Sequence, residues 1–135
     1  MGIADTEEGR GVVCADFDND GDVDILQLHR SGVLAATLWR NETVGNNFLR
    51  VHLKGLTPNT EASGARIRVT IGGASQMREI SIASNFESQN PSLQVFGLGA
   101  ATQVDEIVVE WPDGQQSVMN NVAAGQSIVV DQAGL

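Results

Sequence analysis

The chain has 135 residues, of which 41% are hydrophobic, and a formal net charge of -9 at pH 7. This length provides one globular domain and little more, which excludes a multidomain enzyme. A domain of this size folds without disulfides or a structural zinc ion. The single cysteine, Cys14, has no partner in the chain for an internal disulfide.

The acidic composition and the lack of long apolar runs exclude several classes of partner. General nucleic-acid binding requires clustered positive charge to displace counterions from phosphates. No run approaches the ~20 apolar residues of a membrane helix. Residues 1–11, MGIADTEEGRG, have neither the basic start nor the apolar centre of a signal peptide. We therefore expect no nucleic-acid partner, no membrane insertion and no signal peptide in this sequence.

Apolar and polar residues alternate along much of the chain, which is typical of β-strands with one buried face. Leu49, Val51 and Leu53, for example, alternate with polar residues. About nine or ten short strands predict an all-β fold, either a β-sandwich or a partly open barrel. The strands that we expect lie at residues 12–15, 23–28, 34–40, 49–54, 66–71, 80–82, 93–96, 107–111 and 127–130.

Two short sequences predict where strands reverse. Gly72-Gly73 lies between two β-like runs and favours a tight hairpin. In Trp111-Pro112-Asp113-Gly114, proline stands at the second position of a turn, where its fixed φ fits, and glycine closes the turn. A strand is therefore expected to end at Trp111.

The segment 16–24, DFDNDGDVD, has the spacing of a calcium loop. Carboxylates stand at loop positions 1, 3, 5 and 9, with glycine at position 6 for the sharp turn. The repulsion among these acids would be severe unless a hard dication neutralised part of it. We predict side-chain ligands from Asp16, Asp18, Asp20 and Asp24 and a main-chain carbonyl ligand from Asp22. Calcium suits this donor set better than magnesium, and the alternative is a solvated acidic turn without metal.

The loop differs from an EF-hand at its end. Position 12 of the loop is Gln27 instead of a bidentate glutamate, and both flanks have the pattern of strands. The sequence therefore predicts a β-hairpin calcium loop whose ion is structural and bound more weakly than in intracellular calcium sensors.

Two successive parts of this sequence resemble known families. Residues 11–25, which include the acidic loop, resemble one FG-GAP or VCBS-type calcium repeat of integrin-like β-propellers. The later part contains, in this order, Asn47-Phe48-Leu49-Arg50-Val51, Gly64-Ala65-Arg66-Ile67, Ser88-Gln89, Phe96-Gly97-Leu98-Gly99 and Trp111-Pro112-Asp113-Gly114. Through these pieces the sequence from residue 46 resembles the ASPIC/UnbV domain. The resemblance implies a calcium-loop hairpin at 1–45 and a β-sandwich at 46–135 that form one compact unit, and an extracellular or cell-surface location.

The single calcium repeat departs from the family pattern, in which several repeats close a propeller. One hairpin cannot bury both of its faces. We expect it to pack on the C-terminal sandwich, to pair with a second copy in a homo-oligomer, or to belong to a longer protein. In the last case Leu34, Leu38 and Trp39 would be partly exposed.

The middle of the chain is basic, with five bases and one acid, Glu61, between residues 50 and 78. If the two strands that carry these bases are neighbours, their outward side chains form one positive face for an anionic ligand, such as an acidic or sulfated glycan. The alternative is a solvated surface whose bases have local acidic partners. The residues of this candidate face are Arg50, His52, Lys54, Arg66 and Arg68.

These features predict a non-enzymatic, calcium-stabilised interaction or adhesion module that binds an extracellular protein or glycan. One alternative is a small glycan-processing enzyme with paired carboxylates such as Asp105, Glu106 or Glu110. Its weakness is that Asp105 and Glu106 point to opposite faces of one strand. The other alternative is a structural accessory domain with no ligand beyond calcium.

Overall fold

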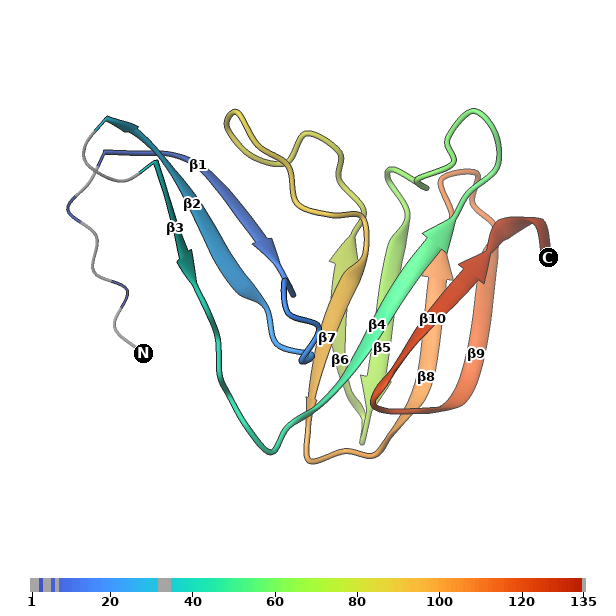
Figure 1. The fold of residues 1–135 in the computed structure, drawn as a ribbon. Helices are drawn as coiled ribbons and strands as arrows, with labels where there is room; N and C mark the ends of the chain where they lie inside the picture. The colour runs from blue at the N-terminus through green and yellow to red at the C-terminus, as the bar shows by residue number, and fades with distance from the viewer. Residues whose placement is uncertain (1–2, 4–5, 7, 32–34, 135) are drawn as a thin grey trace.

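The structure is a computed structural model that describes residues 3, 6, 8–31 and 35–134. These residues form ten β-strands in three sheets and one short 3-10 helix, so the predicted all-β class is confirmed. Two of the sheets pack face to face as a β-sandwich, and the third stands beside them (Figure 1). Among the described residues, no helix is long and apolar enough to cross a bilayer.

The N-terminal sheet consists of β1 (Glu8–Ala15), β2 (Asp24–Ser31) and β3 (Ala36–Trp39), paired antiparallel in chain order. The hairpin of β1 and β2 confirms the strands predicted on either side of the acidic loop. The third predicted strand, at 34–40, corresponds to β3, but Leu34 lies outside the described residues.

The sandwich has a three-stranded and a four-stranded sheet. In the first, β4 (Asn47–Lys54) lies between β7 (Gln94–Gly99), to which it is antiparallel, and β10 (Gln126–Asp131), to which it is parallel. The second has the order β6-β5-β8-β9 and is antiparallel throughout. Its strands are β5 (Arg66–Ile71), β6 (Ala74–Glu79), β8 (Gln103–Glu110) and β9 (Gln116–Ala123).

The hydrophobic core lies between these two sheets. Alternate residues of β4 point into it, because successive side chains of a strand face opposite ways. Leu49, Val51 and Leu53 are accordingly 0–1% exposed. The other strands of these two sheets add further core side chains, among them Ile67, Val69, Phe96, Val104, Ile107, Val109, Val122 and Val130.

Both predicted turns are confirmed. Gly72 and Gly73 join β5 to β6 with φ of 55° and 81°, a left-handed conformation that glycine adopts at little cost. At the other turn, β8 ends at Glu110, and Gly114 N donates a hydrogen bond of 2.9 Å to Trp111 O.

The structure differs from the predicted strands in two places. The strand expected at 80–82 is wrong, because β6 ends at Glu79 and Ile82 is 53% exposed in the loop that follows. The sequence pattern also did not reveal β9. Its asparagines at 120 and 121 have low β propensity, and the strand forms because it pairs along β8.

The N-terminal sheet packs on the sandwich, as the first of the three alternatives predicted, mainly through polar contacts. Side chains of the loop between β6 and β7 form hydrogen bonds with main-chain groups of β1, on the edge of β1 that does not pair with β2. Ser88 Oγ accepts from Val12 N (3.2 Å) and donates to Val12 O (2.9 Å), and Asn90 Oδ1 accepts from Cys14 N (2.9 Å). None of the described apolar side chains of β1, β2 and β3 is fully buried, and Leu38 is 50% exposed. This sheet therefore depends on its junction with the sandwich.

Candidate functional site: the acidic loop and the adjoining pocket

The acidic loop connects β1 to β2 and rests against β4. The ladder between the two strands closes at the pair Ala15 and Asp24, which fixes both ends of the loop. Gly21 has φ of 101°, and a Cβ added there would lie 2.0 Å from Cδ1 of Phe48. Only glycine allows this approach, so the ring of Phe48 seats the loop on the sandwich.

The structure brings together three of the five predicted ligand residues. One carboxylate oxygen each from Asp16, Asp18 and Asp24 lies within 4.8 Å of the others. Asp20 is exposed, and its Oδ1 accepts a hydrogen bond of 2.9 Å from the main-chain nitrogen of Asp22. Asp20 and Asp22 therefore shape the turn but do not belong to this group of three.

The carboxylate of Asp16 is divided between two environments. Oδ2 accepts from Gly21 N (3.0 Å), from Arg50 Nε (2.9 Å) and from a terminal nitrogen of the same guanidinium. Oδ1 is buried without a hydrogen-bond partner among the described residues, and the side chain is only 2% exposed. A buried carboxylate oxygen with no partner is costly, because its lost hydration is not replaced.

Asp24 is 1% exposed and holds two backbone segments in place. Its Oδ2 accepts from Phe17 N (3.1 Å) at the start of the loop. Its Oδ1 accepts from Asn41 N (2.7 Å) in the segment after β3. Each carboxylate oxygen retains a further lone pair, so these hydrogen bonds are compatible with a cation ligand.

The loop is electrostatically strained at Asp22. Burial raises the pKa of Asp22 above its usual 3.8, and the charges of Asp20 and Asp16 raise it further. Convergent carboxylates, a partnerless buried oxygen and a disfavoured negative charge together suit a hard divalent cation with oxygen ligands.

The predicted positive face is not formed, because β4 and β5 lie in opposite sheets of the sandwich. The outward side chains of these strands therefore point away from each other. Carboxylates also neutralise most of the bases: Arg50 pairs with Asp16, Lys54 with Asp131, Arg66 with Glu79 and Arg68 with Glu110, while His52 is exposed on β4. The alternative of a surface with local acidic partners describes these residues better.

The pair of Lys54 and Asp131 lies at the end of the parallel ladder between β4 and β10. Lys54 Nζ donates to Asp131 Oδ2 at 2.6 Å. This hydrogen bond, with a second from the main chain of Ala133, lowers the pKa of Asp131 below its usual 3.8.

Two of the three carboxylates considered for an enzyme, Asp105 and Glu110, have partners outside any shared site. Asp105 Oδ2 accepts from Gly72 N at 2.7 Å in the β5–β6 turn, and Glu110 pairs with Arg68 at 3.6 Å. Neither they nor Glu106 lines the pocket described next. The structure therefore does not bring this set together as a paired acid and base.

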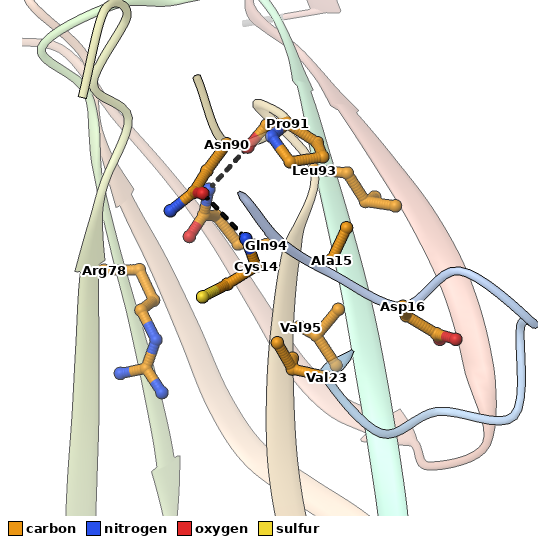
Figure 2. A pocket seen from close by; sticks show the side chains of 10 residues that line it. All are labelled: Cys14, Ala15, Asp16, Val23, Arg78, Asn90, Pro91, Leu93, Gln94 and Val95. Atoms are coloured by element: carbon orange, nitrogen blue, oxygen red, sulfur yellow. Dashed lines mark hydrogen bonds between the residues drawn. The ribbon is translucent and has the colours of Figure 1, made fainter. Parts of the chain in front are cut away.

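A pocket of about 390 Å³ lies between the hairpin and the sandwich. Figure 2 shows that Cys14 and Asp16 of the hairpin, Arg78 of β6 and the segment 90–95 border it. Sequence reasoning missed this pocket, because its residues come from four separate parts of the chain. Its lining residues are Cys14, Ala15, Asp16, Val23, Arg78, Asn90, Pro91, Leu93, Gln94 and Val95.

Fold and site together define a β-sandwich module with an acidic-loop hairpin fastened to one edge. The chain belongs to the ASPIC and UnbV family, whose family model matches residues 55–134. This confirms the resemblance noted for the C-terminal part of the sequence.

Two curated relatives are similar to more of the chain. Cartilage acidic protein 1 of Homo sapiens is 32% identical over 133 residues, which cover 88% of this chain and 18% of that protein. Cartilage acidic protein 1 of Mus musculus is 31% identical over 131 residues, which cover 87% of this chain and 18% of that protein. These matches extend into the hairpin before residue 55. The chain spans less than a fifth of the length of either relative.

Proposed function

We propose that this chain is a non-enzymatic interaction module whose acidic loop binds calcium, and that the ion fixes the hairpin on the sandwich. The observation that carries the proposal is the partnerless, buried Oδ1 of Asp16 in a group with Asp18 and Asp24. In this arrangement Arg50 binds one oxygen of Asp16 and leaves the other for the cation. Calcium would supply a positive charge and accept about six to eight oxygen ligands from the loop, its main chain and water.

The FG-GAP-like character of residues 11–25 supports the same role. The aspartates and the glycine occupy the positions of a calcium loop, and the structure forms a hairpin around them. We assign side-chain coordination to Asp16, Asp18 and Asp24, with Asp20 as a further ligand in the bound state and Asp22 contributing its main-chain carbonyl.

We also propose that the module works outside the cell and binds a protein or a glycan there. The relatives' name, which refers to cartilage, supports an extracellular setting. Extracellular calcium is abundant enough to fill weak sites of Kd around 10⁻⁴–10⁻³ M, the range of extracellular modules.

Thermal unfolding in calcium and in chelator tests the calcium role. At ten to a hundred times the dissociation constant, a ligand that binds only the folded state stabilises it by about 1.4–2.7 kcal/mol. We expect the melting midpoint to rise by several degrees in calcium. Asp18→Asn should abolish most of this rise, and its own folding should be intact because Asp18 makes an exposed ion pair with Arg40.

Glu42→Gln is the matched control, since Glu42 also pairs with Arg40 but lies outside the loop. It should leave the calcium response unchanged. A midpoint that is the same in calcium and in chelator for the wild-type protein would contradict the proposal. An equal response in both variants would place the ion elsewhere.

A further inference from the structure

Arg78 occupies an unusual position at the edge of the sandwich. In the ladder between β5 and β6 it lies opposite the buried Ile67, so its side chain starts on the core-facing side of the sheet. Because β6 is an edge strand, the side chain extends over the ring of Phe96, with Cζ 5.2 Å from the ring centroid. The same side chain borders the pocket (Figure 2).

The guanidinium of Arg78 has no acidic partner among the described residues. It donates only to Met77 O (3.0 Å) and Gln76 Oε1 (3.5 Å), which leaves several of its five N–H donors free. Most other bases of the chain are neutralised by carboxylates, namely Arg30, Arg40, Arg50, Lys54, Arg66 and Arg68. In a protein of net charge -9, this free cation in a concave site is suited to a negatively charged ligand.

The rest of the pocket suits a small polar ligand. Asn90 offers its Nδ2 as a donor, since its Oδ1 accepts from Cys14 N and Asn85 Nδ2, and Gln94 offers its Oε1 as an acceptor, since its Nε2 donates to Ser92 O. Val23, Leu93 and Val95 provide apolar surface. The volume of about 390 Å³ falls within the ~300–1,000 Å³ of small-molecule pockets. Amides beside apolar surface are appropriate for the hydroxyls and the C–H faces of a sugar.

Two observations favour a singly charged saccharide over other anions. A polyanion would be repelled by the net charge of -9, and Arg78 is the only base among the described residues that line the pocket. An extended peptide could not add to β1, because Ser88 and Asn90 already occupy its outer edge.

We propose that this pocket binds a saccharide that carries one carboxylate, with the carboxylate on Arg78 and hydroxyls on Asn90 and Gln94. The inference deepens the proposed function and rests on it only for the view that the chain is a binding module. An arginine on an edge strand also discourages pairing with another sheet, but that role alone requires no sugar affinity.

The test is a titration of the calcium-loaded protein, followed by NMR of its methyl groups. The probes are methyl glucuronide, which has one carboxylate, neutral methyl glucoside, and an aspartyl-glutamyl dipeptide with blocked ends. We expect the glucuronide to bind about tenfold more tightly than the glucoside. The methyl signals that shift should be those of Val23, Leu93 and Val95.

Arg78→Gln should reduce glucuronide affinity to the level of the glucoside, and Arg78→Lys should retain part of the difference. Arg66→Gln is the control, because Arg66 lies in the same sheet but pairs with Glu79. The proposal would be overturned if the two sugars bound with equal affinity or if the two glutamine variants had equal effects. It would also be overturned if the protein preferred the dipeptide or if no methyl signal at the pocket shifted.

The two proposals fail independently. Arg78→Gln should keep the full calcium-dependent rise in melting midpoint, because Arg78 contacts none of the loop acids in the described structure. Glucuronide binding without any calcium response would remove the calcium role and leave the saccharide site. A calcium response without sugar binding would remove the saccharide site and leave the calcium role.

Discussion

Arg50 of β4 and Asp16 of the acidic loop form a buried ion pair that joins the hairpin to the sandwich, with side chains 12% and 2% exposed. The guanidinium also lies over the ring of Phe48, 4.5 Å from its centroid, and the same ring supports Gly21. One arginine thus connects the loop, the ring beneath it and the central strand of a core sheet. Calcium bound to the loop would act directly on this junction.

Arg50→Met is expected to destabilise the protein strongly in chelator. Removing one member of a buried ion pair leaves the other charge uncompensated, at a cost of about 3–5 kcal/mol. In saturating calcium the ion supplies part of the missing positive charge, so the loss should be smaller. Urea unfolding of the variant in calcium and in chelator measures both values.

Lys54→Met is the control for this experiment, since Lys54 lies on the same strand but makes an exposed pair with Asp131. Its effect should be small and the same with and without calcium. If Arg50→Met costs no more in chelator than in calcium, the arginine and the ion do not share Asp16.

Gly21→Ala is expected to disturb the contact between the acidic loop and the ring of Phe48. The added Cβ would overlap the ring of Phe48, and the residue would also have to keep a φ of 101°. Gly73→Ala is the matched control, because Gly73 has a φ of 81° and no atom within 4 Å of the added Cβ. Strain of this backbone type costs about 1–3 kcal/mol, so the excess loss at Gly21, measured by urea unfolding, reports the steric contact. Equal losses would show that the loop does not depend on Phe48.

Asp22→Asn separates the main-chain ligand from the side-chain ligands. Because burial and neighbouring acids raise the pKa of Asp22, its charged form is less favourable in the folded state than in the unfolded state. We expect the variant to melt at a higher temperature than the wild type in chelator. Its calcium affinity, measured by isothermal titration calorimetry, should fall only slightly, because the carbonyl is retained. A loss as large as that of Asp18→Asn would instead make the Asp22 carboxylate a ligand.

The alternation of apolar residues was sufficient to predict the class of the fold and the core-facing residues of β4, such as Leu49 and Val51. The hairpin around the acidic loop was also predictable, because Gly21 and the flanking apolar runs are local signals. β9 and the true end of β6 were not, because pairing with a neighbouring strand decided them against weak local propensity.

Features that depend on which sheet a strand joins could not be derived from the sequence. The bases of β4 and β5 alternate with apolar residues and therefore face away from the core, yet Arg50 and Arg66 belong to opposite sheets. Arg78 was equally hidden, since its position on the core-facing side follows from the register of β6 with β5. The pocket it borders exists only once the hairpin has docked.

Stability should depend on pH through the pair at the end of β10. The hydrogen bond from Lys54 lowers the pKa of Asp131 from 3.8, so the folded state releases this proton more readily than the unfolded state does. The pair therefore stabilises the fold at pH above about 4 and loses its contribution as the pH falls through the lowered pKa. Wild type and Lys54→Met should accordingly differ slightly in melting midpoint at pH 6 and converge as the pH falls through the lowered pKa of Asp131. A difference that persists unchanged in strong acid would show that Lys54 contributes by packing rather than by pairing with Asp131.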